Sequence, residues 1–261
     1  MEIETSRHRY QPARRISHQR TSRVISIAIG VLLLLATRSG SGFTDNRATS
    51  GAIVRRVDFA GYTGGSVEDW LKKQSYQFES DAKKRDRLGL AISDGVLSLE
   101  AKRAMSGIIL NDAINLDGIR WVRINWGVKR YPKDVSYANQ VNNEPLMIYF
   151  FFGKDKIFSG HLLIPNSPYF IGLFLCQDEK INHPYKGRYY HAGGRFVCLG
   201  KPAPGEMITS EFDLDSAFRN YFGQKQTPSL TGISFGVDTS KAGDGGQAEA
   251  LIKSIEFLDS H

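Results

Sequence analysis

The chain has 261 residues, 41% of them hydrophobic and 23% charged, so it is long and apolar enough to form a sizeable core. Its formal net charge of +7 suggests an anionic partner, but seven arginines and only two acidic residues lie within residues 1–42. The remainder carries 27 basic and 25 acidic residues, a net of +2, which argues against nucleic-acid binding.

Residues 1–42 have the pattern of an export leader. A basic stretch ends at Arg23, and thirteen almost purely apolar residues follow, VISIAIGVLLLLA (24–36). A helix that crosses a bilayer needs about 20 apolar residues, whereas a secretory signal has about 7 to 15. The length favours a signal cleaved after Ser41, with an uncleaved anchor or a buried helix as alternatives. We expect a linker at 43–52 and a periplasmic or secreted domain, or one anchored to the inner membrane outside the cytoplasm.

Most of the remaining chain, 53–261, has the pattern of short strands. Residues 96–103 and 119–129 alternate apolar and polar side chains, as half-buried strands do. The continuous apolar runs LMIYFFF (146–152) and YFIGLFLC (169–176) favour central strands that are covered on both faces. Further strands are expected in RYYHAGGRFVCLG, MITSEFDL, LTGISFGVD and AEALIKSIEFL.

Helical signals are few. Asp213 can cap a helix that runs to Phe222 with apolar residues at helical spacing, and Gly223 ends it. Residues 67–74 predict a second, shorter helix. Many strands with one or two helices predict an all-β fold, an antiparallel β-sandwich of the jelly-roll kind over 53–261.

The two cysteines are Cys176 and Cys198. In an oxidising compartment they can form a disulfide, and closing a loop of roughly 20 residues is worth about 3 kcal/mol in the chain-entropy model. The alternative is two buried thiols that never meet. Export favours the disulfide.

The order of segments between residues 55 and 258 is similar to that of a known family. It includes a Trp-rich basic strand, an aromatic strand ending FFG, a helix DLDSAFRNYFG and the stretch PSLTGISFGVDTSKAGDGGQAEALIKSIEFL. In these features the chain resembles domain-of-unknown-function family 3047 of bacterial exported proteins. The resemblance implies a galactose-binding-like or lectin-like β-sandwich in the cell envelope and transfers no catalytic residue. The stretch 172–200 departs from the usual family pattern.

Aromatic and basic side chains are densest in HPYKGRYYHAGGRF (183–196). Aromatic rings stack on the apolar faces of sugar rings, while arginine and histidine reach the hydroxyls. This pattern predicts a carbohydrate site, and the alternative is a hairpin whose tyrosines pack on the sandwich. The outward face of 119–129 is a second candidate. The candidate ligand-binding residues are Tyr185, Tyr189, Tyr190, His191, Arg195, Trp121 and Arg123.

These features favour an envelope protein that binds a glycan or polysaccharide. Local signatures of zinc, acyl-enzyme or nucleotide chemistry, such as HExxH and GxSxG, are absent from the sequence. Sandwich enzymes collect catalytic residues from different strands, so a hydrolase or lyase that uses Glu144, His191 and Tyr190 is one alternative. A structural envelope protein with a protein partner is another. The sequence leaves the glycan and the oligomeric state open.

The stretch GVDTSKAGDGGQAEA (236–250) resembles a calcium-binding loop in four positions, but Ala242 stands where an oxygen ligand is needed and strands flank it. We interpret it as a glycine-rich connection in which aspartates accept turn amides. A structural calcium is the alternative, here or between the first and last strands, and no other cofactor is expected. The candidate metal ligands are Asp238 and Asp244 in the loop, and Asp58 and Glu256 in the two strands.

Overall fold

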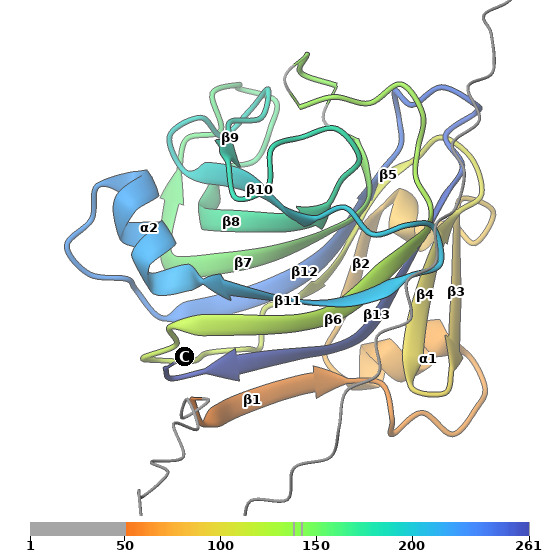
Figure 1. The fold of residues 1–261 in the computed structure, drawn as a ribbon, viewed down its shortest axis with the longest axis horizontal. Helices are drawn as coiled ribbons and strands as arrows, with labels where there is room; N and C mark the ends of the chain where they lie inside the picture. Colours follow the sequence, from red (N-terminus) through yellow and green to blue (C-terminus); the bar gives the residue numbers. More distant parts are fainter. Residues whose placement is uncertain (1–50, 138, 142, 261) are drawn as a thin grey trace, which may run out of the picture. The chain divides into compact units, whose positions relative to one another are not determined.

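The computed structural model describes residues 51–137, 139–141 and 143–260, so the expected leader, with its apolar segment 24–36, lies outside the described residues. The described chain forms two β-sheets packed face to face, with two short α-helices at their margins (Figure 1). Within this described part, no helix is long and apolar enough to cross a membrane. The elements in chain order are β1 (Ile53–Asp58), α1 (Val67–Lys73), β2 (Gln77–Ser80), the 3-10 helix η1 (Asp81–Lys83), β3 (Leu88–Ser93), β4 (Val96–Ala101), β5 (Ser106–Asn111), β6 (Trp121–Arg130), β7 (Glu144–Ile157), β8 (Ser167–Leu175), β9 (Pro184–Tyr185), β10 (Gly194–Gly200), β11 (Met207–Asp213), α2 (Leu214–Phe222), β12 (Leu230–Asp238) and β13 (Ala248–Leu258).

One sheet has the strand order β11-β6-β13-β4-β3, with β1 also paired to β13, and we call it sheet A. The other, sheet B, has the order β2-β5-β12-β7-β8-β10-β9. These named strands pair antiparallel except for β8 and β10, which run parallel. The β-sandwich predicted from the sequence is confirmed, and the parallel pair is a local feature that the sequence pattern did not indicate.

The main hydrophobic core lies between the two sheets. In β6 the alternating residues Val122, Ile124 and Trp126 are fully buried, as the period-two pattern predicted. Phe150 of β7 contacts Phe257 of β13 across the sandwich, with ring centroids 6.0 Å apart. This aromatic pair joins sheet B to sheet A within the main core.

Both predicted helices are present, and the ends of α2 are formed by the two residues that the sequence singled out. The Asp213 carboxylate caps α2 by accepting a hydrogen bond from the Ser216 backbone N–H at 2.8 Å, and Gly223 ends the helix with φ of 66°. Ser66 caps α1 in the same way by accepting from the Asp69 N–H at 3.2 Å. These short helices therefore form where local capping chemistry allows them.

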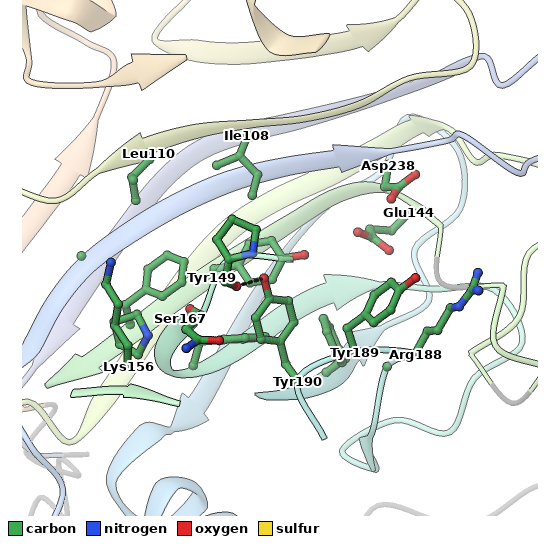
Figure 2. Close-up of a pocket in the computed structure, with 18 of the residues that line it drawn as sticks. Ile108, Leu110, Glu144, Tyr149, Lys156, Ser167, Arg188, Tyr189, Tyr190 and Asp238 are labelled. Carbon is green, nitrogen blue, oxygen red and sulfur yellow. Dashed lines mark hydrogen bonds between the residues drawn. The ribbon is translucent and has the colours of Figure 1, made fainter. Parts of the chain in front are cut away.

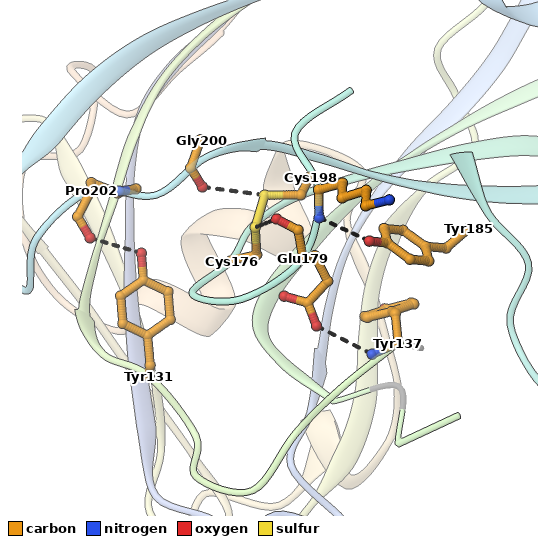
Figure 3. Close-up of a disulfide and its surroundings, with 9 residues drawn as sticks. Tyr131, Tyr137, Cys176, Glu179, Tyr185, Cys198, Gly200 and Pro202 are labelled. Carbon is orange, nitrogen blue, oxygen red and sulfur yellow. Dashed lines mark hydrogen bonds between the residues drawn. A yellow bond between two sulfur atoms is a disulfide. The ribbon is translucent and has the colours of Figure 1, made fainter. Parts of the chain in front are cut away.

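The outer face of sheet B, turned away from the main core, carries a second hydrophobic cluster. Alternation along β7 sends Ile148 and Phe150 into the main core and Tyr149 and Phe151 to the outer face. The predicted disulfide is confirmed: it joins Cys176, just after β8, to β10 at the edge of this cluster (Figure 3). The bond therefore fixes the parallel strand pair beneath the outer face.

The loop 239–247 connects β12 to β13, as the sequence predicted. Asp238 accepts hydrogen bonds from the backbone N–H of Ser240 at 3.0 Å and from its hydroxyl at 2.7 Å, which is the turn role expected of this aspartate. Gly246 has φ of 76°, and a Cβ there would lie 2.4 Å from the Ala104 Cα, so both the conformation and the close approach require glycine.

Candidate functional site

A pocket of about 830 Å³ lies on the outer face of sheet B (Figure 2). Its apolar floor is formed by side chains on neighbouring strands, and Tyr189 and Tyr190 from the loop between β9 and β10 stand over it. The floor residues are Ile108 and Leu110 of β5, Tyr149 and Phe151 of β7, and Phe170 of β8. These pocket residues therefore come from four separate parts of the chain.

Glycines on adjacent strands create the space for this floor. A Cβ at Gly236 of β12 would lie 2.7 Å from Cε2 of Tyr149, so the tyrosine ring rests against bare backbone. The rings of Tyr149 and Phe151 are inclined by only 15°, with centroids 6.1 Å apart. These two near-parallel rings make the floor of the pocket aromatic.

The tyrosine loop is fixed to the loop that follows β7. The Tyr190 hydroxyl donates to the Pro165 carbonyl at 2.9 Å, and its backbone N–H donates to the Ser159 carbonyl at 2.8 Å. The Tyr189 ring contacts His161 on one side and carries the Arg188 guanidinium 5.3 Å from its centroid. Tyr190 has φ of 60°, an uncommon conformation for a large side chain, which these bonds hold in place.

Two carboxyl groups lie at one end of the pocket, Glu144 on β7 and Asp238 on β12 (Figure 2). The two residues are direct partners across the antiparallel pair. Glu144 is only 3% exposed, and its Oε2 accepts a hydrogen bond from the Tyr137 hydroxyl at 2.6 Å. Burial, reinforced by the charge of Asp238, raises the pKa of Glu144 well above its ordinary value.

Asp238 is held by neutral donors. Its Oδ1 accepts from the Asn143 amide at 2.9 Å, besides Ser240, and its Oδ2 accepts from the Ser106 hydroxyl at 3.2 Å. Burial raises the pKa of Asp238, although these hydrogen bonds act in the opposite direction. The pKa of Tyr149 is raised by burial and then by the charges of both carboxyl groups. This end of the pocket is therefore acidic, partly dry and rich in hydroxyl groups.

Of the sequence-predicted ligand residues, Tyr189 and Tyr190 line the pocket, and Glu144 joins them. Tyr185 does not line it: its ring packs on Tyr137 at 5.9 Å, and its hydroxyl accepts from the Lys180 N–H at 2.8 Å (Figure 3). His191 is exposed and outside the pocket lining. The structure thus unites Glu144 and Tyr190 of the predicted catalytic set and leaves His191 apart.

Arg195 also lies away from the pocket. Its guanidinium donates to the carbonyls of His191 and Tyr221 and lies 5.2 Å from the ring centroid of Phe222, so it fastens β10 to α2. Burial lowers its pKa, the opposite of an arginine paired with an anion. In this position the side chain supports α2 and is directed away from any ligand in the pocket.

The second candidate surface is on the other sheet. Trp121 and Arg123 belong to β6 of sheet A, so they do not share a site with the tyrosine loop. Arg123 pairs with Glu211 at 2.5 Å and with Glu256 at 3.2 Å. Its charge is therefore already balanced by two carboxylates of the protein.

The candidate metal ligands are either paired with an arginine or not grouped with other possible ligands. Arg56 bridges Asp58 at 3.0 Å and Glu256 at 2.9 Å, so an arginine occupies the position between the first and last strands that calcium would take. Asp244 is exposed in the β12–β13 loop. Among the described residues, no three His, Cys, Asp or Glu side chains are grouped so as to hold a metal ion. Calcium binding stays a prediction without a formed site.

Sequence reasoning missed the floor of the pocket. Tyr149, Phe151 and Phe170 lie in runs that are apolar throughout, so their pattern does not tell a packed outer face from an open one. The available signal was the glycine spacing of β12, where Gly232 and Gly236 face outward beside the aromatic residues of β7. Small residues opposite large ones on one face of a sheet mark a hollow.

No family model matches the sequence, and no curated protein matches it. Solved structures similar to the chain include mutants of the family 29 carbohydrate-binding module CBM29-2, at 8% identity. One covers 79% of this chain and 93% of that chain at a TM-score of 0.33, and another, complexed with cellulohexaose, covers 78% and 92% at 0.32. The xyloglucanase domain of NopAA, a type three effector from Sinorhizobium fredii in complex with cellobiose, is also 8% identical and covers 79% and 99% at 0.38. Because identity and TM-score are this low, function is inferred below from the chain's own pocket.

Proposed function

We propose that the pocket on the outer face of sheet B binds a carbohydrate chain. The observation that carries the proposal is a pocket whose floor holds the near-parallel rings of Tyr149 and Phe151, with Tyr189 and Tyr190 standing over it and two carboxyl groups at its end. Aromatic rings remove the apolar faces of sugars from water, and carboxylates accept hydrogen bonds from sugar hydroxyls. Pockets of this size, mostly apolar with a few fixed polar groups, are typical of ligand sites.

The test is isothermal titration calorimetry of the purified domain against neutral and amino-sugar oligosaccharides. Replacing Tyr189 by alanine removes one wall of the pocket and leaves the Tyr190 anchor in place, so we expect at least a tenfold loss of affinity. Trp121 and Tyr185 are the two aromatic candidates from the sequence that do not line the pocket, so Trp121→Ala and Tyr185→Phe serve as matched controls with unchanged affinity. Loss of binding in Trp121→Ala but not in Tyr189→Ala would show that the carbohydrate binds on sheet A and not in this pocket.

A glycan-active hydrolase is the second candidate, favoured by Glu144 and Asp238 lying on neighbouring strands in one pocket. A glutamic acid whose pKa is raised can donate a proton to a leaving oxygen, while a second carboxylate acts as base or nucleophile. The assay is release of reducing ends from polysaccharides. Turnover that Glu144→Gln abolishes while binding survives would identify an enzyme, whereas binding without turnover in the wild-type protein identifies a binding module.

Export to an oxidising compartment is part of the same proposal. The disulfide between Cys176 and Cys198 supports it, because such bonds are rare where thiols are kept reduced. Mass spectrometry of the protein from intact cells tests it directly. An N-terminus near residue 42 and an oxidised cysteine pair are expected, and a full-length reduced chain would contradict export.

A further inference from the structure

We propose that the sugar bound at the Glu144 end of the pocket carries a free, protonated amino group, so that the ligand is an oligosaccharide of de-N-acetylated amino sugars. This inference rests on the proposed carbohydrate-binding function and names its ligand class. It starts from the charges that the protein itself supplies at that end. Glu144 and Asp238 are partners across β7 and β12, and both line the pocket.

The two carboxyl groups have only neutral hydrogen-bond donors among the described residues. Tyr137 donates to Glu144, and Ser106, Asn143 and Ser240 donate to Asp238, so no arginine, lysine or histidine side chain is hydrogen-bonded or ion-paired to either carboxyl group within this part of the chain. The pair differs in this respect from Glu256, a glutamate on sheet A that is buried to a similar degree and bound by two arginines.

The wider charge environment strengthens this imbalance. The buried Glu179 carboxylate accepts from the Tyr137 N–H and acts on Glu144 with the same sign as Asp238. Lys241, exposed in the loop after β12, is the cation that acts on Asp238. Figure 2 places Lys156 at the opposite end of the pocket, whereas Arg188, whose guanidinium lies over the ring of Tyr189, is on the same side as Glu144 and Asp238. Three carboxyl groups therefore lie at or beside this end of the pocket, with two cations, Lys241 and Arg188, neither of which is hydrogen-bonded or ion-paired to Glu144 or Asp238 among the described residues.

Glu144 also has bonding capacity left for a ligand. Its side chain is buried, with 3% of the residue exposed. Among the described residues, its Oε2 accepts a hydrogen bond from Tyr137, and its other carboxylate oxygen accepts none. The hydroxyl of Tyr149, which also lines the pocket, forms no hydrogen bond with the described residues. An unpaired carboxylate oxygen and an unpaired hydroxyl thus face the same space.

An ammonium group satisfies these requirements better than a hydroxyl. Two like charges in a partly dry site need either a shared proton or a cation beside them. An ammonium supplies the positive charge and three hydrogen-bond donors at once, and the Tyr149 ring adds a cation–π contact. Hydrogen bonds to charged groups are the strong ones, so an amino group should gain about tenfold to a hundredfold in affinity over its acetylated form.

The experiment compares three oligosaccharides of equal length by calorimetry at pH 6: a glucosamine oligomer, an N-acetylglucosamine oligomer and a cello-oligosaccharide. We expect the glucosamine oligomer to bind at least tenfold more tightly than either of the others. Because an ammonium favours ionised carboxyl groups, its binding should release protons, so the measured enthalpy should change with the ionisation enthalpy of the buffer. Cello-oligosaccharide binding should lack that dependence.

Variants distinguish this selectivity from general attraction of a cation to the protein. Glu144→Gln keeps the size of the side chain and a partner for Tyr137, and it should bring the glucosamine oligomer to the affinity of the acetylated one. Glu79→Gln, which changes an exposed glutamate on β2, is the matched control and should leave the preference intact.

Equal binding of all three oligosaccharides, or a preference that survives Glu144→Gln, overturns the inference and leaves the proposed carbohydrate function standing. Failure of all three to bind overturns the carbohydrate function itself, and this inference with it. A preference that Glu144→Gln removes, together with proton release, supports both.

Discussion

Glu144 is a buried carboxyl group whose position depends on an irregularity in the sheet. Alternation along β7 would turn it toward the main core, but the register against β12 shifts between Gly236 and Asp238, and this irregularity brings Glu144 to the outer face. There it is buried against Tyr137 and beside Asp238, which raises its pKa. Burial makes the ionised form of Glu144 unfavourable in the folded protein. Under the proposed function, a bound cationic group would offset this cost.

The pKa of Glu144 has a measurable consequence for stability. Its folded-state pKa lies above the ordinary value of 4.5, so between these two values the folded protein binds more protons than the unfolded chain, and stability falls as pH rises. Glu144→Gln should remove the part of this pH-dependent loss of stability that Glu144 causes. That part is about 1.4 kcal/mol for each unit by which the folded-state pKa exceeds the unfolded-state pKa. Urea unfolding from pH 4 to pH 8 measures it, with Glu79→Gln as control. Parallel pH profiles for the wild type and Glu144→Gln would contradict the raised pKa.

At the scale of elements, local chemistry decides the helix ends, and covalent chemistry fixes one strand pair. The Asp213 carboxylate accepts from the Ser216 N–H at the start of α2, and Gly223 takes the left-handed conformation at its end. The parallel pair of β8 and β10 is tied by the disulfide, whose two cysteines are 22 residues apart. These two features can be tested separately because they act on different elements.

The N-cap of α2 provides the first test at this scale. Asp213→Ala leaves the Ser216 N–H without its acceptor and should cost about 1 kcal/mol of stability, whereas Asp213→Asn keeps an acceptor and should cost less. Thermal unfolding of the two variants beside the wild type checks this order. Equal losses for alanine and asparagine would show that the side-chain charge, and not the capping bond, is what matters.

The disulfide provides the second test. Replacing Cys176 and Cys198 by alanine should lower the free energy of unfolding by about 3 kcal/mol in the chain-entropy model. A reducing agent should produce a similar loss in the wild-type protein and none in the double variant. Urea titrations with and without the reductant measure both effects, and a wild-type protein insensitive to verified reduction would show that the cross-link contributes little.

At the scale of the whole molecule, the two faces of sheet B have different surroundings. Its inner face packs on sheet A in the main core, and its outer face carries the second cluster and the pocket. Adjacent residues of β7 belong to these two environments: Phe150 is fully buried against Phe257, and Phe151 is half-buried in the pocket. The two faces can thus be altered independently.

This neighbouring pair makes a matched experiment. Phe150→Ala opens a cavity between the sheets and should cost about 3 to 5 kcal/mol. Phe151→Ala removes one of the two near-parallel rings of the pocket floor, so it should cost less stability and lose oligosaccharide binding. Urea unfolding and calorimetry on both variants provide the comparison. Equal destabilisation by the two would show that the outer cluster supports the fold as much as the core does.

The sequence by itself determined the features that depend on neighbours along the chain. Period-two alternation identified the buried face of β6, capping residues identified α2, and an export pattern with two cysteines favoured the disulfide. It also identified Tyr189 and Tyr190 as candidates, because aromatic and basic residues are dense around them.

Only the tertiary structure decided which candidates meet. Tyr185 and Arg195 lie in the same short stretch as Tyr190, yet one packs on Tyr137 and the other fastens α2. The residues that line the pocket together with Tyr190 come from β5, β7, β8 and β12, whose order and register are set by packing between residues far apart in the chain. A local sequence pattern indicates periodicity and capping. It does not determine how distant strands pair or where the bulge turns Glu144 outward. Those features depend on which arrangement of the whole chain buries the most apolar surface without leaving polar groups unpaired.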